Sequence, residues 1–273
     1  MAEEKSRVVL VTGAAGGIGA AITRALIAAG HIVVAVDRNA AGLARLGAVS
    51  GYIFPLVAEL AHETACREVV AATVKRYGRL DAVVNNAGIG VSSLRPDGEK
   101  NLPRIEELTT EIWDNFFAIN ARAPMLVVQA ALPHMRKGGL GRVINNTTSF
   151  RTMLRVLPYG ATKSALESMS AVWAAELKSD GITVNVLIPG GPTDTPFIAD
   201  GAGWDRSKML RPAIMGPPAC WLISDQAAGY TGNRIIAANW DATLPGAEAA
   251  AKAGRAIGWP ELGADAVWLQ AKT

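Results

Sequence analysis

The feature that most constrains the fold of this chain is a regular alternation of short β-branched runs with longer helical patterns. Several of the short runs are apolar on both faces, which is typical of strands buried within a parallel sheet. The stretches between them are rich in alanine and amphipathic, as helices that cover a sheet are. This alternation predicts an α/β fold with one doubly wound, mostly parallel sheet and helices on both of its faces.

The same pattern predicts the bounds of the elements. Seven strands are expected, at 7–12, 31–36, 51–56, 80–85, 141–146, 182–188 and 233–238. The clearest helices are expected at 17–29, 62–77, 109–135, 158–178 and 217–224. No repeat or linker divides the chain, so one domain is expected over 1–240. The extension 241–273 carries Pro245, Trp259, Pro260 and Trp268, and we expect it to pack on this domain or at a subunit interface.

The composition bears on the size of the core, the possible partners and the cellular compartment. Half of the 273 residues are hydrophobic and 19% are charged, so the chain can bury a large core. The net charge of +3 comes from scattered lysines and arginines, which argues against a nucleic-acid partner. No apolar run approaches the roughly 20 residues of a membrane span, and the first seven residues do not read as a signal peptide. Cys66 and Cys220 lie far apart in sequence, which suits a reducing compartment, so a soluble cytoplasmic protein is expected.

The turn between the first expected strand and the first expected helix is rich in glycine. In "VTGAAGGIGAAITRAL", Gly13, Gly17 and Gly19 permit a tight turn and a close approach of the backbone. Free N–H groups at the start of the following helix suit a pyrophosphate. A glycine-rich turn is a weak signal by itself, but the strand before it and the helix after it strengthen the prediction of a dinucleotide site.

Asp37, at the end of the second expected strand, bears on which dinucleotide would bind. An acid at this place can accept hydrogen bonds from both ribose hydroxyls of the adenosine, and it would repel a 2′-phosphate. Arg38 follows directly and could instead pair with that phosphate, face solvent or stack on adenine. NAD is therefore the expected cofactor, and NADP is the less favoured alternative.

The segment "NTTSFRTMLRVLPYGATK" places Tyr159 four residues before Lys163. On a helix these two side chains share one face, about 6 Å apart along the axis. A tyrosine has an unperturbed pKa of about 10, and a nearby cation favours the phenolate. The spacing therefore predicts that Lys163 lowers the pKa of Tyr159, so that the phenol can serve as an acid and a base.

Four motifs together carry a resemblance to a known family. With "TGAAGGIG", "NNAG" at 85–88, Asn120 and "YGATK", in this order and at these intervals, the chain resembles the short-chain dehydrogenase/reductase family. The resemblance runs from about residue 7 to residue 238 and includes "PGGPTDT" at 189–195. It implies a Rossmann domain with a nicotinamide cofactor and a small-molecule substrate. It also implies a homodimer or homotetramer, joined through the long helices and the last strand.

The resemblance implies roles for particular residues. Tyr159 would move the proton of the substrate's alcohol or carbonyl oxygen, and Lys163 would also hold the nicotinamide ribose. Asn120 would mark a helix distortion and serve a proton relay through water. The residues implied for cofactor binding are Gly13, Gly17, Ile18, Gly19, Asp37, Arg38, Glu59, Leu60, Asn86, Ala87, Gly88, Tyr159, Lys163, Pro189, Gly190 and Thr195.

The catalytic hydroxyl that the resemblance implies has two candidates in this chain. Relatives often have a serine about 13 positions before the tyrosine, where this chain has Asn146. Matching the strand instead puts Thr148 in that place, with Ser149 as the alternative. Residues 148 and 149 would point to opposite faces if the strand continued, so one of them is expected to serve.

The substrate pocket is expected between 149–157 and 190–212. These segments supply Phe150, Met153, Leu154, Leu157, Phe197, Trp204 and Met209, with Arg151, Arg155, Arg206 and Lys208 among them. The predicted function is NAD-dependent interconversion of a secondary alcohol and a ketone. Two alternatives stay open: reduction of acyl-carrier 3-ketones, and a sensor or scaffold that binds NAD without turnover. No metal is expected, because His31, His62 and His134 show no ligand spacing.

Overall fold

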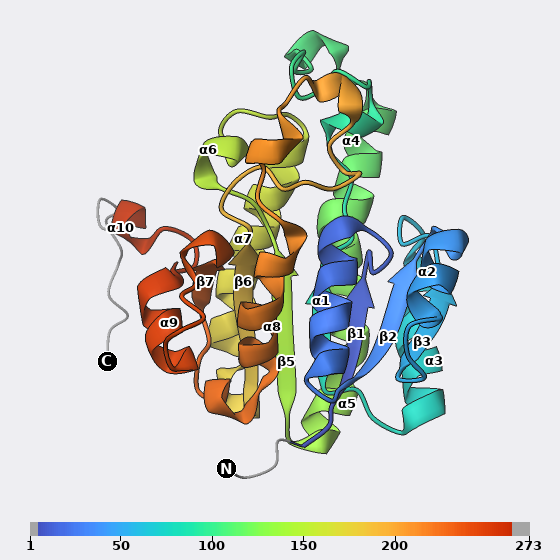
Figure 1. Ribbon diagram of the computed structural model, residues 1–273, viewed down its shortest axis with the longest axis vertical. Helices are drawn as coiled ribbons and strands as arrows, with labels where there is room; N and C mark the ends of the chain where they lie inside the picture. The colour runs from blue at the N-terminus through green and yellow to red at the C-terminus, as the bar shows by residue number, and fades with distance from the viewer. Residues whose placement is uncertain (1–4, 264–273) are drawn as a thin grey trace, which may run out of the picture.

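An eight-stranded sheet runs through the computed structural model, which describes residues 5–263. Its strand order is β3-β2-β1-β4-β5-β6-β7-β8, and only β8 is antiparallel to its neighbour. The strands are β1 (Val8–Thr12), β2 (Ile32–Asp37), β3 (Ile53–Val57), β4 (Ala82–Asn85), β5 (Gly141–Asn146), β6 (Ile182–Ile188), β7 (Asn233–Ile236) and β8 (Gly254–Ala256). The doubly wound α/β fold is thereby confirmed (Figure 1).

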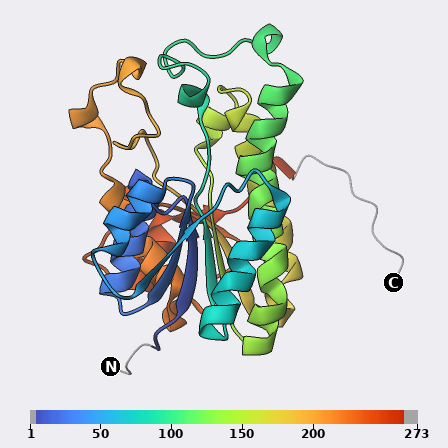
Figure 2. The same cartoon turned by 90° about the vertical axis from the view of Figure 1, so that its right-hand side faces the viewer.

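Helices cover both faces of the sheet. They are α1 (Gly17–Ala28), α2 (Ala40–Gly47), α3 (Glu63–Tyr77), α4 (Thr110–Phe117), α5 (Ala123–Gly138), α6 (Phe150–Met153), α7 (Tyr159–Glu176), α8 (Gly216–Ile223), α9 (Gly246–Ala253) and α10 (Pro260–Gly263). Helices α1, α2, α8 and α9 pack on one face, and α3, α5 and α7 pack on the other. Figure 2 shows the two helix layers with the sheet between them.

Alternating side chains of the strands fill the two spaces between the sheet and its helices. Val9 and Val11 of β1 pack with Ile22 of α1, whereas Leu10 packs with Val127 of α5 on the opposite face. All five residues of β1 and all seven of β6 are buried, as expected for strands covered on both faces. Each fully buried aliphatic side chain stabilises the fold by about 1.5–3 kcal/mol relative to an exposed one.

The structure differs from the sequence-based expectation in its short elements. The seven expected strands are present, and β8 is an eighth that was not expected because "GRA" is short and lacks a hydrophobic pattern. The helix expected over 109–135 is two α-helices, α4 and α5, joined by a π-helical turn, η3 (Ala118–Arg122). Helices α2, α6, α9 and α10 were also missed; all are short, although α8, which has eight residues as well, was expected.

The helical segment Thr110–Gly138 is long and apolar enough to cross a membrane by length and composition. However, 61% of its apolar window is buried inside the protein. The buried residues of α5 pack against α3 and the sheet in the second hydrophobic core. Its apolar face is therefore covered by the rest of the chain.

Three long segments rise beyond the carboxyl ends of the parallel strands. They follow β4, β5 and β6, and they span 86–109, 147–158 and 189–215 (Figure 1). In open α/β sheets, ligands bind outside the carboxyl ends of the strands, next to the point where the strand order reverses. Here the order reverses between β1 and β4, which places the expected site beneath these segments.

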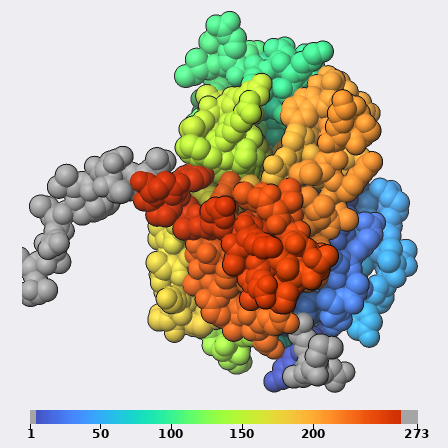
Figure 3. Space-filling view, turned by 60° about the vertical axis from the view of Figure 1, so that its left-hand side comes forward, coloured from blue at the N-terminus to red at the C-terminus, as the bar shows by residue number. Residues whose placement is uncertain are grey.

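The C-terminal extension, as far as residue 263, lies on the same domain. Ala249, Ala250 and Ala253 of α9 are buried, and β8 continues the sheet beyond β7. The ring of Trp259 lies 4.6 Å from that of Phe150, measured between centroids. Figure 3 shows this red segment next to the yellow-green segment that contains α6. Trp268 lies outside the described residues.

Substitution in α9 tests whether the extension is docked in this way. Ala250 is fully buried, whereas Ala251, the next residue of the same helix, is exposed. Ala250→Asp should lower the free energy of unfolding by about 3 kcal/mol or more, because it buries an unpaired charge. Ala251→Asp should change it by less than about 0.5 kcal/mol. Denaturant unfolding measures both, and equal effects of the two substitutions would contradict the docked position of α9.

Candidate active site

A cavity of about 800 Å³ lies beneath the three segments at the carboxyl ends of the strands. Every residue implied for cofactor binding lines it, and so do both candidate hydroxyl residues, Thr148 and Ser149. Asn120 does not line it. The cavity extends from Asp37, at the end of β2, to Tyr159, at the start of α7. One cavity therefore brings together the glycine-rich turn and the tyrosine–lysine pair.

The glycine-rich turn packs too tightly for side chains. Gly13 has φ +65°, and a Cβ there would lie 2.8 Å from the Cα of Ala87. A Cβ on Gly19 would lie 2.0 Å from the carbonyl oxygen of Gly13. Helix α1 begins at Gly17, and its N-cap, Gly16, offers no side chain to the free N–H groups of the first turn. The residues that carry these N–H groups line the cavity, and such a helix start suits the pyrophosphate of a dinucleotide.

Asp37 supports the same turn from the end of β2. Its carboxylate accepts hydrogen bonds from the N–H groups of Ala15 and Asn39, each at 2.9 Å. Arg38 is exposed and lies 3.4 Å from Glu59, measured between nitrogen and oxygen. An exposed pair at this distance contributes little to stability. This end of the cavity therefore carries two carboxylates and one guanidinium.

The "NNAG" segment ties the ends of three strands together. The Thr12 hydroxyl of β1 accepts hydrogen bonds from the N–H groups of Asn86 and Ala87, both at 3.0 Å. The Asn86 amide donates to the carbonyls of Thr12 and Gly13, and its oxygen accepts from Asn146 of β5 at 2.9 Å. These bonds fix the glycine-rich turn against β4 and β5.

Asn120 lies in the π-helical turn η3, in agreement with the expected helix distortion. Its side chain is fully buried, accepts from the N–H of Ile89 at 2.8 Å and donates to the Ile89 carbonyl at 2.9 Å. It also donates to the Thr162 hydroxyl of α7 at 3.1 Å. Asn120 therefore joins the segment after β4 to the helix that carries the tyrosine. Its part in a proton relay stays a prediction.

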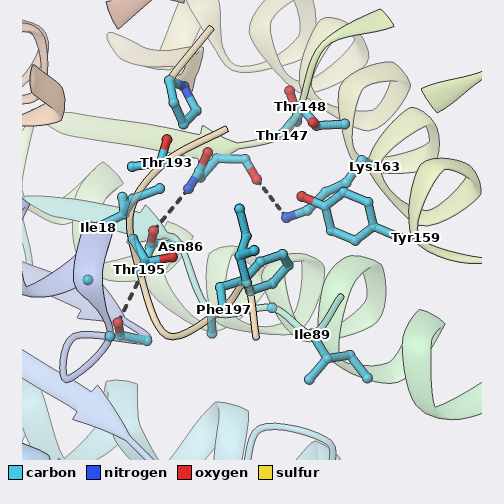
Figure 4. Close-up of a pocket in the computed structure, with 18 of the residues that line it drawn as sticks. Ile18, Asn86, Ile89, Thr147, Thr148, Tyr159, Lys163, Thr193, Thr195 and Phe197 are labelled. Carbon is cyan, nitrogen blue, oxygen red and sulfur yellow. Dashed lines mark hydrogen bonds between the residues drawn. The ribbon is translucent and has the colours of Figure 1, made fainter. Parts of the chain in front are cut away.

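Tyr159 and Lys163 lie on one face of α7, as their spacing predicts. The Lys163 ammonium is 5.8 Å from the centroid of the Tyr159 ring (Figure 4). It donates a hydrogen bond of 2.7 Å to the carbonyl oxygen of Asn146, at the end of β5. Burial lowers the pKa of Lys163 to about 8. Near neutral pH the amine therefore still carries its proton in most molecules, and it loses the proton as the pH rises through about 8.

The pKa of Tyr159 differs from the expectation. Burial raises it above its usual value, a hydrogen bond from the Thr148 side chain lowers it, and the Glu99 carboxylate raises it further. The expectation that Lys163 lowers this pKa is wrong for the chain by itself, because Lys163 does not contribute to the shift and burial is its largest cause. A charged ligand in the cavity would have to supply further stabilisation of the phenolate.

The two candidate hydroxyls have different partners. The Thr148 side chain lies close enough to the Tyr159 phenol to lower its pKa. Ser149 instead caps α6, because its hydroxyl accepts from the Thr152 N–H at 3.1 Å and lies 2.9 Å from the Thr152 hydroxyl. Both residues line the cavity, and which of them works with the tyrosine stays a prediction.

The substrate end of the cavity differs in part from the expected pocket. Arg151, Arg155, Phe197 and Trp204 line it as expected. The remaining expected pocket residues do not line it: Phe150, Met153, Leu154, Leu157, Arg206, Met209 and Lys208. Most of them are used elsewhere. Met153 and Met209 are buried in the core, Phe150 packs on Trp259, and Arg206 pairs with Asp194 and Asp200.

The contribution of the segment after β4 was not expected from the sequence. Glu99 and Leu102 of this segment line the cavity, and its Ser92 hydroxyl accepts a hydrogen bond from the Ala199 N–H of the segment after β6. The missed signal is the length of "VSSLRPDGEKNLPR", which far exceeds the usual connection of about 2–6 residues between a strand and a helix. Loops of that length are commonly functional.

Comparisons with known proteins agree with this geometry. Residues 7–203 match the family model described as short chain dehydrogenase. The chain is 31% identical to L-fucose dehydrogenase of Bos taurus over 84% of this chain and 87% of that protein. It is 33% identical to D-threitol dehydrogenase of Mycolicibacterium smegmatis over 84% of this chain and 90% of that protein.

A solved structure is similar over almost its whole length. It is 3-ketoacyl-(acyl-carrier-protein) reductase from Brucella melitensis complexed with NADH, with a TM-score of 0.72 and 26% identity. The alignment covers 85% of this chain and 96% of that structure. Together with the family match, the glycine-rich turn and the tyrosine–lysine pair, it shows that the chain belongs to the short-chain dehydrogenase/reductase family of nicotinamide-dependent oxidoreductases.

Proposed function

We propose that this protein is an NAD-dependent enzyme that interconverts a secondary alcohol and a ketone. The observation that carries the proposal is that Tyr159, Lys163 and Thr148 meet in the cavity whose other end holds Asp37 and the turn before α1. NAD, when bound, would accept or return a hydride. We further propose that residues 1–240 act as one binding and catalytic unit in a cytoplasmic homodimer or homotetramer.

Proton transfer is the work of this chain's own side chains. During oxidation, the Tyr159 phenolate takes the proton of the substrate hydroxyl, and during reduction the phenol returns it to the carbonyl oxygen. Thr148 holds that oxygen beside Tyr159. Phe197, whose ring centroid is 5.8 Å from that of Tyr159, shields the reacting atoms from water. Lys163 keeps its amine beside the phenol through its bond to Asn146.

The rival functions make different demands on the same cavity. A carrier-bound 3-ketone would need a basic entrance, and Arg151 and Arg155 are exposed there, but Glu99 shares the lining with them. The fucose and threitol relatives are named for polyhydroxy substrates. Such a substrate could hydrogen-bond both to the arginines and to the Glu99 carboxylate. A non-catalytic NAD-binding protein would have no need of the complete tyrosine, lysine and threonine set.

An absorbance assay separates these possibilities. NADH formation or consumption at 340 nm would be followed with polyols, simple secondary alcohols, ketones and a 3-ketoacyl thioester. We expect turnover of secondary alcohols or ketones, with polyols preferred. Turnover of the thioester alone would favour the carrier-bound alternative. Binding of NADH without turnover of any substrate would favour the sensor.

The carboxylates at the adenosine end predict a preference for NAD. Asp37 and Glu59 should repel a 2′-phosphate, so kcat/KM with NAD should exceed that with NADP by at least about tenfold, or about 1.4 kcal/mol. Arg38→Ala should leave kcat/KM with NAD within about twofold, because Arg38 is exposed and held only by a weak pair. Equal use of the two cofactors would show that Arg38 dominates this end.

The contacts of the two hydroxyls predict unequal effects of their removal. Tyr159→Phe should abolish turnover and leave NADH binding, measured by fluorescence titration, nearly unchanged. Thr148→Val should lower kcat by about 10²-fold or more, in the range of a lost preorganised donor. Ser149→Ala should lower kcat by less than about tenfold, because its hydroxyl caps α6. The reverse order of the last two variants would make Ser149 the catalytic hydroxyl.

The Glu99 carboxylate predicts a shift in the pH profile. Its negative charge raises the pKa of Tyr159, so Glu99→Gln should stabilise the phenolate and lower that pKa. Because oxidation needs the phenolate, the rise of kcat/KM with pH should move to lower pH in Glu99→Gln. The exposed Asp97, two residues away, gives the control Asp97→Asn, which should not move the profile. A shift to higher pH, or equal shifts in both variants, would contradict this electrostatic role of Glu99.

A further inference from the structure

A buried ion pair lies outside the cavity, behind the residues that carry the hydroxyls. Arg234 of β7 and Glu167 of α7 approach to 3.6 Å, and their side chains are 7% and 0% exposed. Neither residue lines the cavity. Buried ion pairs are weak stabilising devices, because the loss of hydration offsets the attraction. What this pair contacts is therefore more informative than its contribution to folding.

Both members of the pair hold the backbone or side chain of the segment after β5. The Thr147 hydroxyl donates to the Glu167 carboxylate at 2.7 Å. The Arg234 guanidinium donates to the carbonyl oxygen of Thr148. Two consecutive residues are thus fixed by two charged groups, one through a side chain and the other through the backbone. These two contacts restrict the movement of the backbone at Thr147 and Thr148.

The C-terminal extension completes this arrangement. Strand β8 pairs with β7 so that Arg255 lies opposite Arg234, and the Ile257 N–H donates to the Gly232 carbonyl at 3.1 Å. Burial raises the pKa of Glu167, while Arg234, Thr147 and the Gly258 N–H oppose the rise by stabilising the carboxylate. The extension therefore lies beside the strand that carries Arg234.

The next residue of the extension reaches α6. Gly258 and Trp259 both have positive φ, +79° and +50°, a conformation that is unfavourable for a tryptophan. This turn brings the Trp259 ring to 4.6 Å from the ring of Phe150, the first residue of α6. The segment 147–150 is thus held from the pair on one side and from the extension on the other.

We propose that Glu167 and Arg234, supported by residues 254–259, are positioning residues that hold the Thr148 hydroxyl in its working direction. The proposal rests on the proposed function, since it assigns these residues to the same reaction. A displacement of about 1 Å at a reacting group can lower a rate by about 10²-fold, so a fixed loop matters more to kcat than to cofactor affinity. The alternative is that the pair only stabilises the fold.

Two buried arginines allow a matched comparison. Arg7, with a side chain 3% exposed, pairs with Asp225 and does not line the cavity. Arg234→Met should lower kcat by about tenfold or more and leave the NADH dissociation constant within about twofold. Arg7→Met should lose thermal stability but keep kcat, per folded molecule, within about twofold of the unsubstituted protein. Arg234→Lys, which keeps a donor, should recover part of the lost kcat.

A second measurement needs neither cofactor nor substrate. Hydrogen–deuterium exchange of the backbone over 147–153 should be faster in Arg234→Met than in the unsubstituted protein, and unchanged in Arg7→Met. If Arg234→Met does not fold, Trp259→Ala takes its place and should likewise speed exchange over 147–153 and lower kcat. Its control is Trp113→Ala, which removes a comparable ring contact, 4.7 Å from Phe117, on α4.

Two outcomes would overturn the proposal. In the first, Arg234→Met has the kcat and the slow exchange over 147–153 of the unsubstituted protein, and it loses only thermal stability, as Arg7→Met does. The pair would then stabilise the fold without positioning Thr148. In the second, Trp259→Ala behaves as Trp113→Ala does in both measurements. Absence of turnover in the unsubstituted protein would refute the proposed function instead, and the exchange comparison would still decide whether the pair fixes the segment.

Discussion

The site depends on keeping an amine out of water. Burial of Lys163 is costly for its charged form, and the structure offsets this with one short hydrogen bond to the last carbonyl of β5. That bond joins α7 to the end of a strand, and it fixes where Tyr159 can lie. Asn120 joins α7 to the segment after β4 through its bonds to Thr162 and Ile89. The "NNAG" segment joins the ends of β4 and β1 through the bond from Asn86 to Thr12. The glycine-rich turn and Tyr159 are thus held in register by bonds among the strand ends, the start of the segment after β4, the turn η3 and α7.

The parts of this structure that were predictable from sequence are those with local signals. Apolar runs mark the parallel strands, and Gly13, Gly17 and Gly19 mark a turn that a Cβ would disrupt. The four-residue spacing of Tyr159 and Lys163 gives their common face directly. These signals succeed because each depends on neighbours in the chain.

What the sequence did not reveal depends on contacts between distant residues. The pKa of Tyr159 reflects burial and Glu99, which comes from a long segment without a helical or strand pattern. Thr148 and Ser149 are adjacent and chemically alike, and only the cap of α6 and the contact with Tyr159 distinguish them. Glu167 and Arg234 are 67 positions apart in the sequence, and nothing near either residue marks it as buried. The fold brings them together in the interior. No periodicity encodes such a pair.

The eighth strand has a consequence for how the sheet ends. An open sheet offers unpaired backbone groups at both edges, and these can recruit strands from other chains. Here β3 carries Pro55 at one edge, which removes a donor, and the chain's own β8 occupies the outer side of β7 at the other. The new edge, β8, has three residues and includes a charged arginine. Within residues 5–263, both edges of the sheet are therefore protected against growth by strand addition.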